Sequence, residues 1–498
     1  YYVFGYLDTL LAYKAFCLSS IIFSIFLFGY FVYELCQSKK LAYLVILISP
    51  VLFQYRFYFD PFLSWGSFMQ IMLVYTCISL ICLIKYARTK KTGFLIVSLL
   101  FYIFSLLTYE IAYSFFLFHI IIISYTNRKT ASDSTTSIMA AVPFVVVAFV
   151  CAGISLYLRS QATGIANSYT INWNLFSILK TFGYQISAAL PLVYNYTGRT
   201  IFQFSSLNFI ISDWKNLILI ISLPLLLIYI LRFEKSRLHG QKNKNLLLAT
   251  IVGFLFICLP ASLIALSPKI QGQLAFGVGY IPVYIQYFGT SLVLAIIVGT
   301  THRKWLKSFL LMFIMITALH HSQSNSAVVD AVNKTYQYPR ELLETFLKDS
   351  EFKAVQDHST IIFNKPNHLH NKAFLNMHTG KKLNVEIGNG RILDPSTNSG
   401  QYYVQTQYNY PDAIVQFSRH SDLRDQSNLL ETVQTRYKHI DVWKRNKEGK
   451  DLILPRFSDG RVTIYHAGGE YLPFPVRSNR KTFSIELLVK PEPRNGLY

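Results

Sequence analysis

Two charged residues of opposite sign lie four positions apart between two apolar runs of this chain. Arg56 and Asp60 belong to the segment 54–61, which reads QYRFYFDP. Because a charge beside hydrocarbon is costly, its presence there calls for a role. We expect Asp60 to act as a catalytic general base or orienting group, and Arg56 to bind an anionic headgroup. The alternative is a helix N-cap, because Asp followed by Pro is a common helix start.

A second carboxylate, Glu110, falls at the break between two further apolar runs. A buried carboxylate at this break would need a cationic partner, for which Lys269 or Arg56 would serve. We place Glu110 in the candidate site as a second catalytic carboxylate, with its neighbour Tyr109 as a substrate-binding residue. The alternatives are a structural ion pair or a favourable charge in the first turn of a helix.

A third polar position is the isolated Lys269, which Gln271 follows just before an aromatic, proline-containing helix start. Its ammonium group would bind the phosphate of a lipid-linked substrate, with Gln271 beside it as a further substrate-binding residue. The alternative is a lysine that extends its charge to the lipid headgroups. No Cys or His cluster has the spacing of metal ligands, so we expect no metal site, and a divalent ion has no support.

The elements that must position these residues are membrane-spanning helices. Hydrophobic residues make up 52% of the 498 residues and charged residues only 15%, whereas a soluble domain has roughly 25% charged residues. Over residues 1–321 the apolar runs approach the length of roughly 20 residues that crosses a bilayer. The sequence predicts an α-helical polytopic membrane domain of about nine spans, two of which, 41–58 and 309–319, are short. The chain begins at Tyr1 rather than Met, so either the protein is processed or its start is missing; we expect a missing start with one more span upstream.

The formal net charge is +21. The positions of the basic residues follow the topology of the membrane domain and do not indicate a nucleic-acid-binding surface. Lys and Arg concentrate in alternate connections between the apolar runs, which is typical of cytoplasmic loops. The other connections, with the candidate site, are then expected on the outer face. The long connection 159–214 is expected there too, with helices on the membrane surface around 172–194. The basic connections are 37–40, 85–91, 127–129, 232–244 and 302–307.

Residues 322–498 change character and predict a soluble α/β or β-rich domain outside the cytoplasm. An amphipathic helix is expected at 339–348. Short β-type runs separated by turn residues follow it. These runs are 360–363, 384–387, 402–405, 413–417, 439–443, 461–465 and 481–490.

The outline of residues 1–321 resembles the GT-C class of membrane glycosyltransferases in its many spans and in the acidic residues of its outer loops. The resemblance implies transfer of a sugar from a polyprenyl-phosphate-linked donor to a glycan, lipid or protein acceptor. No cofactor beyond the lipid-linked donor is implied, and the implied location is a bacterial inner membrane. In the class, the main catalytic acid lies in the first outer loop. With one span upstream, Asp60 matches the second acidic position, and the main acid would precede Tyr1.

Two other functions remain open from the sequence. A non-catalytic membrane subunit or anchor with an exposed binding domain fits the small number of charges within the spans and the lack of a diagnostic catalytic motif. A transporter needs polar residues along a path at mid-membrane, and the spans offer few.

Overall fold

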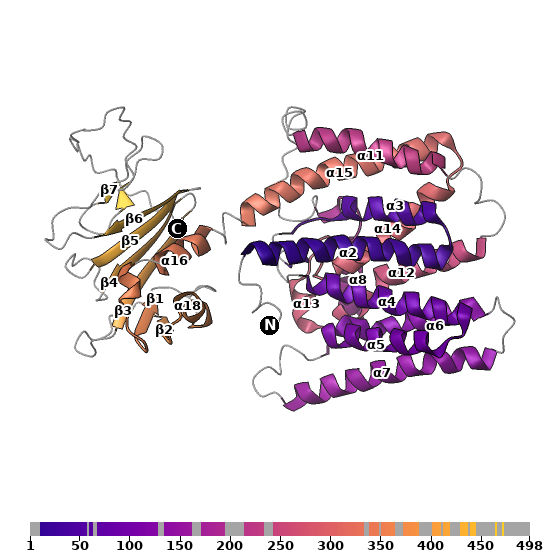
Figure 1. Ribbon diagram of the computed structural model, residues 1–498, viewed down its shortest axis with the longest axis horizontal. Coiled ribbons are helices and arrows are strands. Elements are labelled where there is room, and N and C mark those ends of the chain that lie inside the picture. Colours follow the sequence, from indigo (N-terminus) through magenta and orange to yellow (C-terminus); the bar gives the residue numbers. More distant parts are fainter. Residues whose placement is uncertain are drawn as a thin grey trace. The chain divides into compact units, whose positions relative to one another are not determined.

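The computed structural model divides the chain into two compact units, Tyr1–Val329 and Asp330–Tyr498 (Figure 1). The sequence predicts the boundary at 321/322, a position that lies inside the last helix of the first unit, Lys304–Val332. The structure describes residues 10–56, 59–62, 67–127, 134–161, 171–194, 214–233, 243–332, 338–347, 350–363, 372–387, 401–409, 412–418, 429–436, 439–444, 464–465 and 471–472.

The described part of the first unit is helical. Its long helices are α2 (Leu10–Cys36), α3 (Lys39–Leu52), α4 (Phe68–Thr89), α5 (Thr92–Thr108), α6 (Phe116–Asn127), α7 (Ser134–Gln161), α11 (Trp214–Phe233), α12 (Asn243–Ile264), α14 (Val283–Thr300) and α15 (Lys304–Val332). Shorter elements are the 3₁₀ helix η1 (Glu110–Phe115) and the helices α8 (Leu175–Ser187) and α13 (Pro268–Gln273).

Among the described residues, six helices are long and apolar enough to cross a membrane by length and composition, and three shorter helices are also apolar. These helices indicate an integral membrane protein. The expected spans 41–58 and 309–319 differ in length from what is observed, since α3 ends at Leu52 and α15 extends to Val332. Polar groups explain both differences, because α15 uses polar side chains beyond His320 to bind the backbone that follows α3.

Successive long helices run in alternating directions, so their connections gather at two ends of the bundle (Figure 1). One end, here called the basic end, holds residues 37–40, 88–91 and 301–304. There Arg88 Nη1 bonds Glu34 Oε2 at 2.6 Å and joins the ends of α2 and α4. The other end, here called the site end, holds residues 53–56 and 59–62, η1, α8 and α13.

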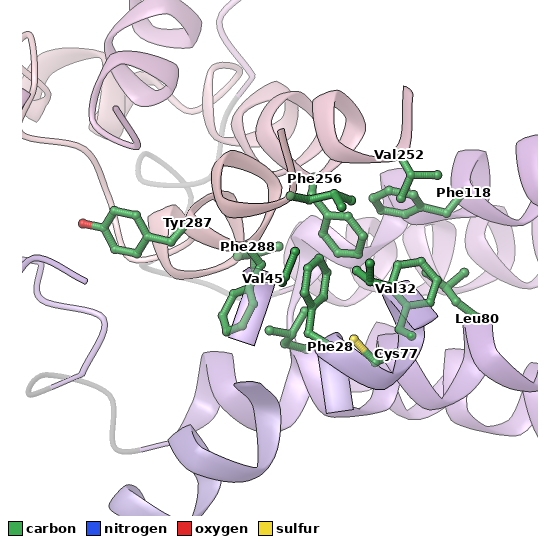
Figure 2. Packing of buried hydrophobic residues seen from close by; sticks show 14 of the residues in the cluster. Phe28, Val32, Val45, Cys77, Leu80, Phe118, Val252, Phe256, Tyr287 and Phe288 are labelled. Atoms are coloured by element: carbon green, nitrogen blue, oxygen red, sulfur yellow. The ribbon is translucent and has the colours of Figure 1, made fainter. Parts of the chain in front are cut away.

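The core of the first unit is rich in aromatic rings. Phe28 of α2 contacts Phe256 of α12 and Phe288 of α14, with ring centroids 5.2 and 5.0 Å apart (Figure 2). The ring centroids of Phe118 of α6 and Phe256 lie 4.4 Å apart, with the two rings tilted by 37°. Such offset and edge-to-face pairs add to the packing of helices that hydrophobicity alone does not hold together in lipid.

Helices α12 and α14 approach each other closely at two glycines, Gly253 and Gly289. A β-carbon added to Gly289 would lie 2.6 Å from the Gly253 carbonyl oxygen and 2.9 Å from the Ile257 backbone nitrogen. Small residues permit this close contact between backbones within a membrane.

We expect Gly289→Ala to destabilise the protein by about 1–3 kcal/mol, because the overlapping atoms are backbone and the helices must separate. Thermal unfolding of the purified protein in detergent measures this. The control is Gly153→Ala in α7, where nothing lies within 4 Å of an added β-carbon. Equal melting temperatures for the two variants would contradict the close contact.

The second unit contains a six-stranded sheet in the order β2-β1-β3-β4-β5-β6. β1 pairs in parallel with β2 and β3, and the pairs from β3 to β6 are antiparallel. The strands are β1 (Thr360–Phe363), β2 (Asn384–Ile387), β3 (Gln401–Asn409), β4 (Asp412–Ser418), β5 (Leu429–Arg436) and β6 (His439–Lys444), with a separate pair β7 (Ile464–Tyr465) and β8 (Tyr471–Leu472). The helices are α16 (Tyr338–Leu347), α17 (Ser350–Lys353) and α18 (Lys372–Thr379).

The core of the second unit joins helix and sheet residues. Leu343 and Phe346 of α16 pack in one cluster with Ile361 and Phe363 of β1. Strand β5 was not predicted from the sequence, because Glu, Gln and Thr interrupt the apolar residues of this strand. Of the expected strand 461–465 the structure describes only Ile464–Tyr465, and 481–490 lies outside the described residues.

Candidate functional site

The segment after α3 is held by two polar side chains of α15. The Tyr55 backbone N–H donates to Asn325 Oδ1 at 2.7 Å, and Asn325 Nδ2 donates to the Phe53 carbonyl at 2.9 Å. One turn earlier on α15, the His321 Nδ1 lies 2.7 Å from the Val51 carbonyl. Side chains of α15 therefore satisfy backbone groups that the end of α3 leaves without helical partners.

Asp60 is buried, with 1% of its surface exposed, and its carboxylate is directed at backbone. Oδ2 accepts the Arg56 backbone N–H at 2.5 Å, and Oδ1 accepts that of Phe62 at 2.7 Å. The carboxylate thus joins the backbone N–H groups of Arg56 and Phe62. It is not the N-cap of the following helix, because α4 begins only at Phe68, after Ser67.

Arg56 is fully buried, and its guanidinium joins several segments. Nη2 donates to the Ala188 carbonyl at 2.8 Å and to the Tyr287 hydroxyl at 3.0 Å. Nη1 donates to the Val278 carbonyl, and the guanidinium carbon lies 5.0 Å from the centre of the Tyr194 ring. The side chain that we expected to bind an anionic headgroup therefore links α8, residues 274–282 and α14 from inside the protein.

Helix α8 faces the protein with polar residues. Gln185 is fully buried, and its Nε2 donates to Gln286 Oε1 at 2.9 Å and to the Tyr280 carbonyl at 3.2 Å. Its Oε1 accepts the Tyr280 backbone N–H at 2.7 Å. The opposite side is apolar and exposed, so the helix is amphipathic with its apolar face outward. The exposed apolar residues of this face are Leu175, Phe176 and Leu179, and Trp173, which precedes the helix, is also exposed.

The Arg56 contacts require a glycine at position 279. Gly279 has a φ of +62°, and an added β-carbon would overlap both Arg56 Nη1 and the Ala188 β-carbon. Both the left-handed backbone and the lack of space exclude a side chain there.

We expect Gly279→Ala to destabilise the protein by about 2–4 kcal/mol, as the sum of left-handed strain and overpacking. The melting temperature of the purified protein measures this. Gly183→Ala on α8 is the control, because nothing lies within 4 Å of its added β-carbon. A loss of stability in the control as large as that in Gly279→Ala would contradict the argument.

Glu110 is the first residue of η1 and is partly exposed. The preceding residue, Tyr109, has an extended backbone, with φ −159° and ψ 142°, and its ring lies 5.7 Å from that of Phe68 at the start of α4. η1 packs against α12, and its Ser114 hydroxyl donates to the Leu259 carbonyl at 3.3 Å. The break in the apolar sequence at Glu110 is therefore a real change of helix type at the site end.

Lys269 and Gln271 lie on α13 and differ in their surroundings. Lys269 is exposed. Gln271 Oε1 accepts from Asn172 Nδ2 at 2.6 Å, and its Nε2 donates to the Ala265 carbonyl at 2.7 Å. Gln271 thus ties the segment before α8 to the end of α12, and of this pair Lys269 is the one directed to the surroundings.

All six residues predicted from the sequence lie at the site end, but they divide by burial. Arg56 and Asp60 are interior residues, whereas Lys269 is exposed and Glu110 is partly exposed. Sequence reasoning missed His321, Asn325 and Gln185. The polar run 320–326 at the end of an apolar stretch was a signal for the first two.

Within the described residues there is no group of three or more His, Cys, Asp or Glu side chains that could hold a metal ion. Comparison of the chain with models of protein families, with curated proteins and with solved structures finds no match in any of the three. The geometry of the site end is therefore the basis for inferring function.

Proposed function

We propose that the chain is a membrane glycosyltransferase that moves a sugar from a polyprenyl-phosphate-linked donor to an acceptor on the outer face of the membrane. The main support is the arrangement of the site end. There, a partly exposed carboxylate, an exposed lysine and an amphipathic helix with an outward apolar face share the end of the bundle that lies away from the basic loops. A lipid-linked, charged substrate needs all three.

In this proposal the site end faces the outer side, because the basic end is typical of the cytoplasmic side. The oxygen of the acceptor hydroxyl attacks the anomeric carbon of the sugar, and the Glu110 carboxylate takes up the proton of that hydroxyl. The bond from that carbon to the phosphate oxygen breaks, and the polyprenyl phosphate leaves. Lys269 stabilises the negative charge that develops on the phosphate. Asp60 holds the backbone of Arg56 and Phe62 in place, and Arg56 holds the end of α8.

The experiment is a transfer assay with the full chain reconstituted in proteoliposomes. Radiolabelled polyprenyl-phosphate sugars are supplied with glycan, lipid or protein acceptors, and both the labelled acceptor and the released polyprenyl phosphate are measured. The expected result is release of polyprenyl phosphate that matches the sugar transferred. The proposal fails if no donor of this class is consumed while the protein is folded.

The second candidate is a non-catalytic membrane subunit or anchor whose C-terminal unit binds a partner. The observation that favours it is the use of Arg56 and Asp60 for backbone contacts inside the protein. In the same assay this candidate predicts no donor consumption, together with binding of a glycan or protein by the full chain.

A further inference from the structure

His321 of α15 is buried, and all its hydrogen bonds are made within the protein. Nδ1 lies 2.7 Å from the Val51 carbonyl, Nε2 lies 2.9 Å from Gln54 Nε2, and the Leu192 backbone N–H donates to Nε2 at 3.3 Å. A carbonyl only accepts and a backbone N–H only donates, so Nδ1 carries the proton and Nε2 is an acceptor. This set of contacts, called here the His321 latch, exists only with a neutral imidazole.

The latch holds a residue in an unfavourable conformation. Leu192, in the turn after α8, has a φ of 69°. A residue with a β-carbon rarely adopts this left-handed region, and the surroundings must compensate for its cost. The bond from the Leu192 N–H to His321 supplies one such compensation. The latch also joins three segments that are far apart in sequence, namely the end of α3, the turn after α8 and α15.

The groups around His321 would oppose a positive charge on its imidazole ring, because the positively charged Arg56 is already nearby. Arg56 acts on it electrostatically from the segment after α3, and His320 does so from its own helix. Asp60 binds the backbone of Arg56. The Tyr287 hydroxyl and the Tyr194 ring contact the Arg56 guanidinium. A proton on Nε2 would point at the donating N–H of Leu192 and add charge beside Arg56.

We propose that the His321 latch is an acid-sensitive conformational device, in which protonation of His321 releases the turn after α8 and the end of α3. This inference goes beyond the proposed sugar transfer and does not depend on it. Acid would loosen residues 188–194 and 51–56 while the aromatic core around Phe28 and Phe256 remains packed.

The test is hydrogen exchange of the full chain in proteoliposomes between about pH 7.5 and about pH 5, corrected for the intrinsic pH dependence of exchange. We expect peptides over 188–194 and 51–56 to exchange roughly tenfold faster at the acidic end, with α14 unchanged. In His321→Gln the response should disappear. The glutamine amide does not titrate, yet it can donate to Val51 and accept from Leu192.

His320→Gln and His302→Gln are the matched controls and should keep the response. The proposal is overturned if the wild-type peptides do not respond to acid, or if His321→Gln responds as the wild type does. Should His321→Gln fail to fold, the double variant His302→Gln/His320→Gln decides. A retained response supports His321, and a lost response overturns the proposal.

Discussion

Replacing Glu110 by glutamine is expected to lower the rate of sugar transfer by about 10²- to 10⁴-fold, the usual contribution of a positioned general base. Glutamine keeps the size and hydrogen-bonding capacity of the side chain but cannot take up the acceptor proton. The helix η1 and its contact with α12 should remain, because they depend on the backbone and on Ser114. The measurement is the initial rate of polyprenyl phosphate release in proteoliposomes.

The matched control is Glu34→Gln at the basic end. Glu34 lies near the C-terminal end of α2, and its carboxylate binds Arg88. Its replacement therefore removes a negative charge from the same unit, but at the basic end and not at the end that holds Glu110. Its transfer rate should stay within about twofold of the wild type, because Glu34 lies at the opposite end of the bundle and glutamine can still accept hydrogen bonds from Arg88 and Tyr30. A Glu110→Gln protein that transfers sugar at the rate of the control would exclude Glu110 as the base.

Replacing Arg56 by methionine is expected to destabilise the first unit by about 3–5 kcal/mol. Methionine fills much of the same space, but it leaves the Ala188 and Val278 carbonyls without their donor. It also leaves Asp60 buried without the neighbouring positive charge. We expect the melting temperature of the purified protein to fall by roughly 5–15 °C.

Two further variants make this result specific. Arg56→Lys keeps the charge but loses the planar fork that reaches two segments at once, so its stability should lie between those of the wild type and of Arg56→Met. Arg303→Met removes an exposed arginine at the basic end and should change stability by less than about 0.5 kcal/mol. If Arg56→Met were as stable as Arg303→Met, the guanidinium contacts would have no structural role.

Much of the first unit could be predicted from local sequence patterns. In lipid, an apolar run must hydrogen-bond its own backbone polar groups, which it does as a helix. Composition alone therefore locates such helices. The predicted ends of helices were wrong where a side chain distant in sequence binds backbone groups that would otherwise pair within the helix. The predicted span 41–58 ends early at Leu52, because Asn325 binds the backbone of Phe53 and Tyr55. No local pattern around residue 53 contains that information.

By itself the sequence determined that Asp60, Glu110 and Lys269 interrupt apolar runs at connections of one kind, because charge and hydropathy are properties of the local chain. The tertiary structure alone decided what each group can do. It turned the Asp60 carboxylate toward two backbone N–H groups and enclosed the Arg56 guanidinium, while Glu110 and Lys269 stayed accessible. The reason is that a buried charge must find partners, and helix packing fixes which partners lie within reach.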